Sequence, residues 1–76
     1  MIWHAGHAYI VRYAGRHTFS AVYCGQNGEQ LQFRFLARYV PSTGAGYSRG
    51  DVDWFDADGC EALSEFGPGP WSKAGG

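Results

Sequence analysis

The sequence predicts a small α+β domain that is mainly β, with a three- to four-stranded antiparallel meander and one short C-terminal helix packed on the sheet. Three observations predict this class. Apolar and polar residues alternate along three separate segments, which is the period of a half-buried strand. Glycine-containing turns separate those segments. Near the C-terminus, apolar residues recur at a spacing of three after an aspartate that can cap a helix.

The three predicted strands span residues 8–14, 18–24 and 31–40. Their odd positions are mostly apolar, and in the third strand every odd position from 31 to 39 is apolar. Because neighbouring side chains on a strand point to opposite faces, we expect the odd positions to form the core. The same alternation places Arg12, Arg34 and Arg38 on the opposite, outward face.

The turn between the second and third strands is constrained by register, since both inward sets must lie on one face of the sheet. A three-residue loop over 26–28, with Gly28 in a left-handed conformation, pairs Tyr23 with Leu31 and Ala21 with Phe33. A two-residue turn at Asn27 and Gly28 pairs an inward residue with an outward one. We therefore predict the bulged hairpin.

Pro41 and the glycines that follow it end the third strand, because proline cannot donate to a ladder of hydrogen bonds. Val52 and Trp54 then alternate with aspartates, which indicates a short fourth strand at an edge of the sheet. The chain reads as a single domain over residues 1–76, with a folded body at 1–67 and a tail rich in Gly and Pro at 68–76.

The C-terminal helix is predicted over residues 59–66. Asp58 and Glu61 have the spacing of a capping box, with Asp in place of the usual Ser or Thr. Cys60, Leu63 and Phe66 lie three apart and would share one side of the helix. A helix of this length is too short to persist alone, so it must pack on the sheet.

Charge is distributed unevenly along the chain, although the formal net charge is only −1. Residues 1–50 hold five arginines against one glutamate, a balance of +4, whereas residues 51–76 hold six carboxylates against one lysine, a balance of −5. The small net charge argues against a protein that holds nucleic acid by bulk electrostatics. The uneven distribution predicts a molecule with one basic and one acidic side.

The N-terminal residues show no basic region followed by an apolar run, so we expect no secretory signal. No apolar stretch of about 18 residues is present that could span a membrane. We therefore expect a cytoplasmic protein with no membrane partner, in which Cys24 and Cys60 are reduced.

Metal binding is not favoured by the spacing of the available ligands, and we expect no cofactor. His4 and His7 are three apart, so on a strand they would point to opposite faces and could share a metal ion only across a turn. The acidic positions around Asp58 match part of a calcium loop, but Trp54 stands where that loop requires its first acidic ligand.

No nucleophile lies in a recognised strained turn and no phosphate-binding glycine motif is present, so we expect no enzyme. The acidic segment 51–65, interrupted by aromatic residues, instead suggests an interaction surface for another protein with a basic surface. Its predicted contact residues are Asp51, Asp53, Trp54, Phe55, Asp56, Asp58, Glu61 and Glu65.

In size and charge layout the chain resembles host-directed proteins of phages and mobile elements, anti-CRISPR proteins among them. The resemblance implies a small module that binds another protein, or a stoichiometric inhibitor. The alternative is a protein that binds single-stranded nucleic acid through the outward Arg12, Arg34 and Arg38, because guanidinium planes stack on bases.

Overall fold

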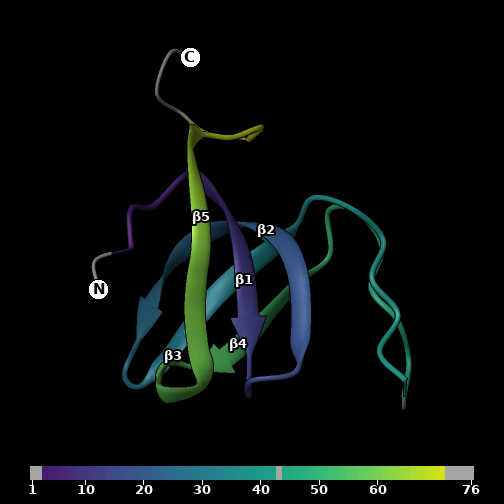
Figure 1. The fold of residues 1–76 in the computed structure, drawn as a ribbon. Coiled ribbons are helices and arrows are strands. Elements are labelled where there is room, and N and C mark those ends of the chain that lie inside the picture. The colour runs from purple at the N-terminus through teal and green to yellow at the C-terminus, as the bar shows by residue number, and fades with distance from the viewer. Residues whose placement is uncertain (1–2, 43, 72–76) are drawn as a thin grey trace.

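The computed structural model describes residues 3–42 and 44–71. Its strands are β1 (His7–Tyr13), β2 (His17–Asn27), β3 (Gln30–Phe35), β4 (Val52–Asp56) and β5 (Cys60–Pro68), with the 3₁₀ turn η1 (Ala57–Gly59) before β5. They form one antiparallel sheet of five strands in the order β4-β3-β2-β1-β5 (Figure 1). The prediction of a small, mainly β, antiparallel fold is confirmed. The predicted count of three or four strands and the C-terminal helix are wrong.

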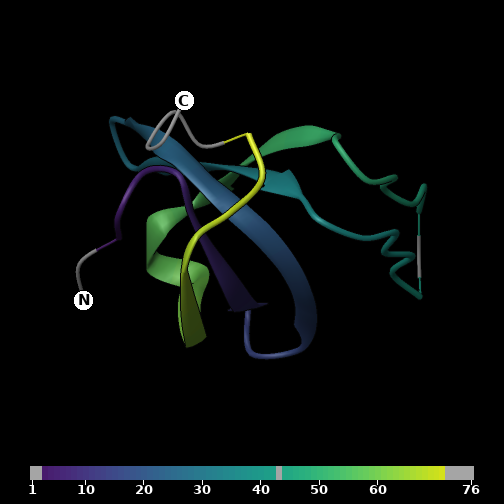
Figure 2. The ribbon, with the colours of Figure 1, turned by 90° about the horizontal axis from the view of Figure 1, so that it is seen from above.

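The sheet is strongly curled, as the view from above shows (Figure 2). Strands β2 and β3 lie between β1 and β4 in the sheet, yet the rings of Tyr13 on β1 and Phe55 on β4 have centroids 5.0 Å apart across the concave side. The concave side holds the core, and its most buried side chains come from odd positions of β1, β2 and β3. They are Tyr9, Val11, Phe19, Ala21, Tyr23, Leu31, Phe33 and Phe35. The predicted inward sets of these strands are therefore confirmed, except that Tyr13 and Tyr39 are only half-buried and Ala37 is exposed.

The predicted helix over 59–66 is replaced by β5, which pairs antiparallel with β1. Cys60 and Ala62 pack against the core while Glu61 and Leu63 are exposed, which is the alternation of a strand. On its other side β1 already pairs with β2, so β5 gives hydrogen-bond partners to a strand edge that a helix would leave open. The pairing contains register shifts, which let the strand bend with the curled sheet.

The predicted helix cap has no counterpart, because Asp58 lies inside η1 and not before it. Asp56 precedes this turn, and its side chain makes no capping hydrogen bond. The turn is only three residues long and reverses the chain from β4 to β5.

The hairpin between β2 and β3 differs from the predicted register by two residues. Tyr23 pairs with Phe33, and Ala21 pairs with Phe35. The turn is shorter than predicted, with two residues between the paired Asn27 and Gln30, and the irregularity lies further back, between 23 and 25. Shortening the turn by one residue would by itself place the inward side chains of β2 and β3 on opposite faces. The extra residue of the bulge reverses this effect, so the inward side chains of both strands stay on one face. The left-handed conformation predicted for Gly28 is confirmed by its φ of 63°.

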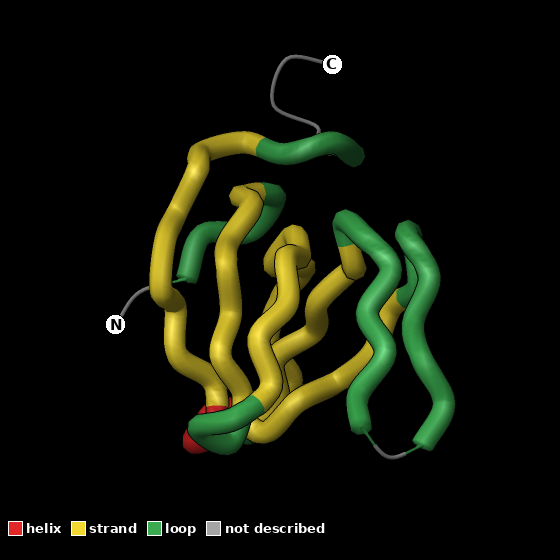
Figure 3. The backbone as a smooth tube through the Cα atoms, turned by 45° about the vertical axis from the view of Figure 1, so that its right-hand side comes forward, coloured by secondary structure: helices red, strands yellow, loops and turns green. Residues whose placement is uncertain are grey.

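The third strand ends at Phe35, five residues before the predicted end. The chain then leaves the sheet, and the two limbs of the 36–51 connection run side by side away from it (Figures 1 and 3). An antiparallel bridge joins Tyr39 to Tyr47 across these limbs. At its base, Gly50 N donates to the Phe35 carbonyl at 2.8 Å, and Arg49 Nη1 donates to the Leu36 carbonyl at 2.9 Å. The connection is thus tied to the sheet where it enters β4.

The segment after β5 folds over the convex side of the sheet. Gly69 N donates to the Gly6 carbonyl at 2.8 Å, and a Cβ on Gly69 would lie 2.9 Å from Cγ2 of Val22. This contact explains why Val22, although outward-facing, is only 3% exposed. The remainder of the predicted tail, residues 72–76, lies outside the described residues. Among the residues that are described, no helix has the length and apolar character needed to cross a bilayer.

Candidate functional site

An open aromatic pocket of about 220 Å³ lies at the end of the core where the 36–51 connection meets the sheet. Its floor consists of Phe19 and Phe35, which are buried, and the other side chains around it are half-buried. We call this the aromatic pocket. Its lining residues are Tyr13, His17, Phe19, Phe35, Tyr39, Pro41, Tyr47 and Phe55.

Ring packing and hydrogen bonds hold the walls of the aromatic pocket in place. Tyr47 stacks on Phe35 with ring centroids 4.2 Å apart and an angle of 8° between the planes. Nδ1 of His17 and the hydroxyl of Tyr39 share a hydrogen bond of 2.8 Å. Because the Tyr39–Tyr47 bridge fixes the backbone of both tyrosines, the walls are formed before any ligand binds.

The hydroxyl of Tyr47 donates a hydrogen bond to Oδ2 of Asp53 on β4. This bond to the carboxylate, together with burial of the ring, raises the pKa of Tyr47 to about 12. Asp53 also accepts a bond from the Trp54 backbone N–H through Oδ1, at 2.8 Å. Asp53 is therefore a support for the pocket wall.

A second pocket, of about 380 Å³, shares the side chain of Tyr13 with the first. It lies between η1 and the turns that end β1 and β2, and three of its lining residues are carboxylates. We call this the acidic pocket. Its lining residues are Tyr13, Ala14, Glu29, Asp56, Asp58 and Gly59. A Cβ on Gly59 would lie 2.8 Å from the Tyr13 ring, so glycine is what lets η1 approach the shared wall.

The structure divides the eight predicted contact residues among several places. Phe55, Asp56 and Asp58 lie at the two pockets, and Asp53 supports the aromatic one. Trp54 points outward from β4 and is 39% exposed. In the loop before β4, Oδ2 of Asp51 accepts a hydrogen bond from the Ser48 backbone N–H at 2.9 Å. Glu61 and Glu65 lie on β5, at the opposite edge of the sheet order.

Two of the three arginines proposed as a nucleic-acid face have partners within the chain. Arg12 Nη2 forms an ion pair with Glu61 at 2.9 Å. Arg34 donates to the Gly50 carbonyl at 3.2 Å, and its guanidinium lies 4.4 Å from the centre of the Trp71 ring. Arg38 is exposed.

The two thiols, Cys24 and Cys60, are free. Burial raises the pKa of both, and that of Cys60 reaches about 11. Within residues 3–42 and 44–71, no three side chains of His, Cys, Asp and Glu gather closely enough to hold a metal ion.

Sequence reasoning did not single out most of the pocket residues. Tyr13 and Tyr39 were assigned to the core, Pro41 was given only the role of ending the third strand, and Tyr47 and Glu29 were not proposed for any site. One signal was present, namely that Tyr39 and Tyr47 flank a short stretch that contains Pro41, Ser42, Gly44 and Gly46. Such a stretch allows the chain to turn back and bring two aromatic rings together.

Comparisons with protein family models, curated proteins and solved structures found no match for this chain.

Proposed function

We propose that this chain is a protein-binding module that receives a segment of another protein at the aromatic and acidic pockets. An apolar or aromatic side chain of the partner enters the aromatic pocket, and an adjacent Lys or Arg side chain enters the acidic pocket. The observation that carries the proposal is that the two pockets share Tyr13 as a common wall. A single short segment can therefore reach both.

The size of the aromatic pocket favours one side chain of a larger partner. Its volume of about 220 Å³ is below the roughly 300–1,000 Å³ of pockets that enclose a whole small molecule. Preformed aromatic walls are typical of the anchor points that dominate protein interfaces.

The charge of the acidic pocket favours a basic neighbour for that anchor. Glu29, Asp56 and Asp58 are all exposed, and none of them takes part in the ion pairs found within the described part of the chain. Their charges are thus available to a partner, in contrast to Glu61 and Glu65, which are paired. Complementary charge at an interface raises the association rate and selects the partner.

Protein is favoured over single-stranded nucleic acid because the outward arginines are largely occupied. Arg12 and Arg34 would have to give up Glu61 and Trp71, respectively, to reach a phosphate or a base. The carboxylates of the acidic pocket would repel a phosphate backbone.

The proposal can be tested by selecting peptides from a random display library against the immobilised protein. We expect the selected peptides to share an aromatic or large apolar residue next to Lys or Arg. Binding of the selected peptide, measured by calorimetry, should weaken at least about tenfold in the double variant Asp56→Asn/Asp58→Asn, and should weaken as salt is raised. Tyr39→Ala should also weaken it, because it removes one wall of the aromatic pocket.

Glu61→Gln is the matched control, since it also removes a carboxylate charge but lies on β5. Selected peptides that lack basic residues, or equal losses in the Glu61 control and the double variant, would contradict the proposed site. Tight binding of a single-stranded oligonucleotide that is lost in Arg34→Ala and Arg38→Ala would favour the alternative.

A further inference from the structure

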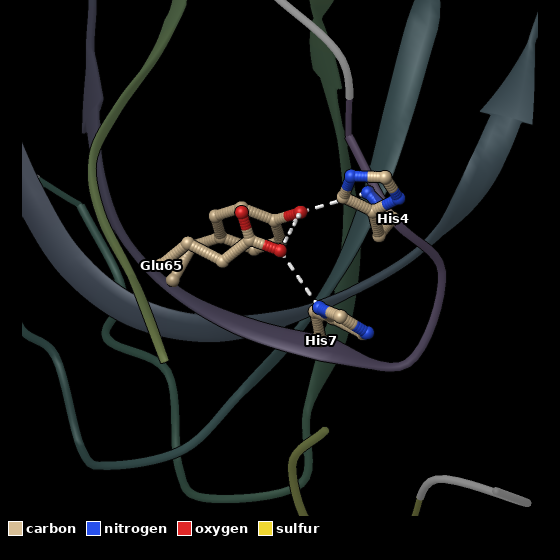
Figure 4. Close-up of polar contacts among 4 residues, drawn as sticks. His4, His7 and Glu65 are labelled. Atoms are coloured by element: carbon tan, nitrogen blue, oxygen red, sulfur yellow. Dashed lines mark hydrogen bonds and ion pairs between the residues drawn. The ribbon is translucent and has the colours of Figure 1, made fainter. Parts of the chain in front are cut away.

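A second group of polar side chains lies away from the two pockets, where the chain enters β1. Nδ1 of His7 lies 2.7 Å from Oε2 of Glu65 on β5, and the hydroxyl of Tyr9 donates to the same oxygen at 3.3 Å (Figure 4). The ring of His4 lies beside that of His7, with 5.2 Å between ring centroids. At this corner of the sheet, one imidazole contacts the carboxylate and the second imidazole lies beside the first.

A turn brings the two histidines together. His7 N donates to the His4 carbonyl at 3.0 Å, and Gly6 between them has a φ of 86°, which favours glycine. Gly6 N donates to the Tyr23 carbonyl at 2.8 Å, and His4 N donates to the Tyr9 hydroxyl at 2.7 Å. The backbone on both sides of the turn is therefore held against β1 and β2. This is the arrangement that lets residues three apart present their rings on the same side.

The contact with Glu65 holds the His7 ring in one orientation. A carboxylate cannot donate, so in the neutral imidazole the proton lies on Nδ1 and Nε2 keeps its lone pair. Metal-binding histidines commonly donate their second ring nitrogen to a carboxylate in this way, which fixes the ring and increases its basicity. The negative charge of Glu65 also attracts a cation to this corner.

The spacing of the rings fits two positions around one ion. With metal–nitrogen distances of about 2.0–2.1 Å and a tetrahedral angle, two imidazole ring centres lie about 5 Å apart. The observed separation is 5.2 Å. The His4 side chain is exposed, so rotation about its side-chain bonds can direct a nitrogen towards the ion.

We propose that His4 and His7 together bind a divalent transition-metal ion, with Glu65 as the residue that orients His7. Solvent completes the coordination shell, so the site is exchangeable. Imidazole suits Cu²⁺ and Zn²⁺, and the general order of affinities places Cu²⁺ above Zn²⁺. A structural zinc site with four protein ligands binds with about 10–16 kcal/mol. Two ligands should supply roughly half of that free energy, so we expect a Kd for Zn²⁺ on the order of 10 μM.

The test is calorimetric titration of the native chain with zinc sulfate, together with NMR of the histidine ring protons. We expect one Zn²⁺ per chain, with shifts in the rings of His4 and His7. His4→Ala should weaken binding at least about tenfold because it removes one of two ligands, and its exposed side chain can be replaced without disturbing the fold. Glu65→Ala should weaken binding by about 10–100-fold through loss of the orienting contact.

His17→Ala is the matched control, because this ring is occupied by its bond to Tyr39 and lies at the aromatic pocket. It should leave Zn²⁺ affinity unchanged. The proposal is overturned if no binding is detected up to 1 mM Zn²⁺, if His4→Ala binds as the native chain does, or if the His17 variant loses as much affinity as the His4 variant. Peptide binding at the two pockets is a separate measurement, so either result leaves the other proposal intact.

Discussion

Replacing Phe33 with alanine tests whether the inward side chains of β3 form the core of the curled sheet. Phe33 is 0% exposed and its ring lies within 5.2–6.1 Å, centroid to centroid, of four other aromatic rings. Truncation of such a residue removes its buried surface and leaves a cavity, at a cost of about 3–5 kcal/mol. At roughly 0.05–0.15 kcal/mol per residue, a chain of 76 residues has a total stability of about 4–11 kcal/mol. The Phe33→Ala variant should therefore lose a large part of its stability.

Urea unfolding followed by tryptophan fluorescence measures this loss. With a slope of about 1 kcal/mol per molar urea, a loss of 3 kcal/mol lowers the midpoint by about 3 M. Phe66→Ala is the matched control, because the same side chain is removed at a position that is 65% exposed, and its cost should stay below about 1 kcal/mol. If the two variants lost similar stability, the assignment of the odd positions of β3 to the core would be refuted.

Two further predictions follow from raised pKa values. At pH 8, Cys60 in the folded chain should react with iodoacetamide about 100-fold more slowly than in the urea-unfolded chain, because burial raises its pKa from 9.0 to about 11; equal rates, measured by mass spectrometry, would contradict this. Stability should fall between pH 10 and about 12, because the unfolded chain releases the Tyr47 proton in that range while the folded chain retains it through the bond to Asp53. Tyr47→Phe should flatten this fall, and an unchanged slope would show that the bond does not hold the proton.

Local patterns were sufficient to predict much of the sheet. The alternation in β1, β2 and β3 predicted which side chains face inward, because burial of one face is a property of each strand by itself. The register of the β2–β3 hairpin was wrong, since parity constrains which face a residue takes but does not distinguish registers that differ by two residues. The bulge before Gly25 supplies the extra residue, and no local pattern requires it there.

The prediction of a C-terminal helix was wrong because the same residues fit both the period of a helix and the period of a strand. Cys60, Leu63 and Phe66 have helical spacing, whereas Cys60 and Ala62 have strand spacing. Burial distinguishes the two, since Leu63 and Phe66 are 42% and 65% exposed and therefore form no buried stripe. What decides the matter is the unpaired edge of β1, which lies about 50 residues earlier in the sequence. A contact so distant cannot be inferred from local propensity.

The acidic segment 51–65 was predicted as one contact surface, but the order of the strands separates its residues in space. Its residues are continuous in sequence, but β4 and β5 are the two edge strands of the sheet, and η1 carries the chain from one to the other. The carboxylates on β5 have partners on β1, where Arg12 forms an ion pair with Glu61 and Nδ1 of His7 contacts Glu65. Asp56 and Asp58, at η1, line the acidic pocket together with Glu29 from the β2–β3 turn, so like charges gather beside Tyr13. Like charges brought together without a cation destabilise a fold, which is why the partner that we propose for that pocket is basic.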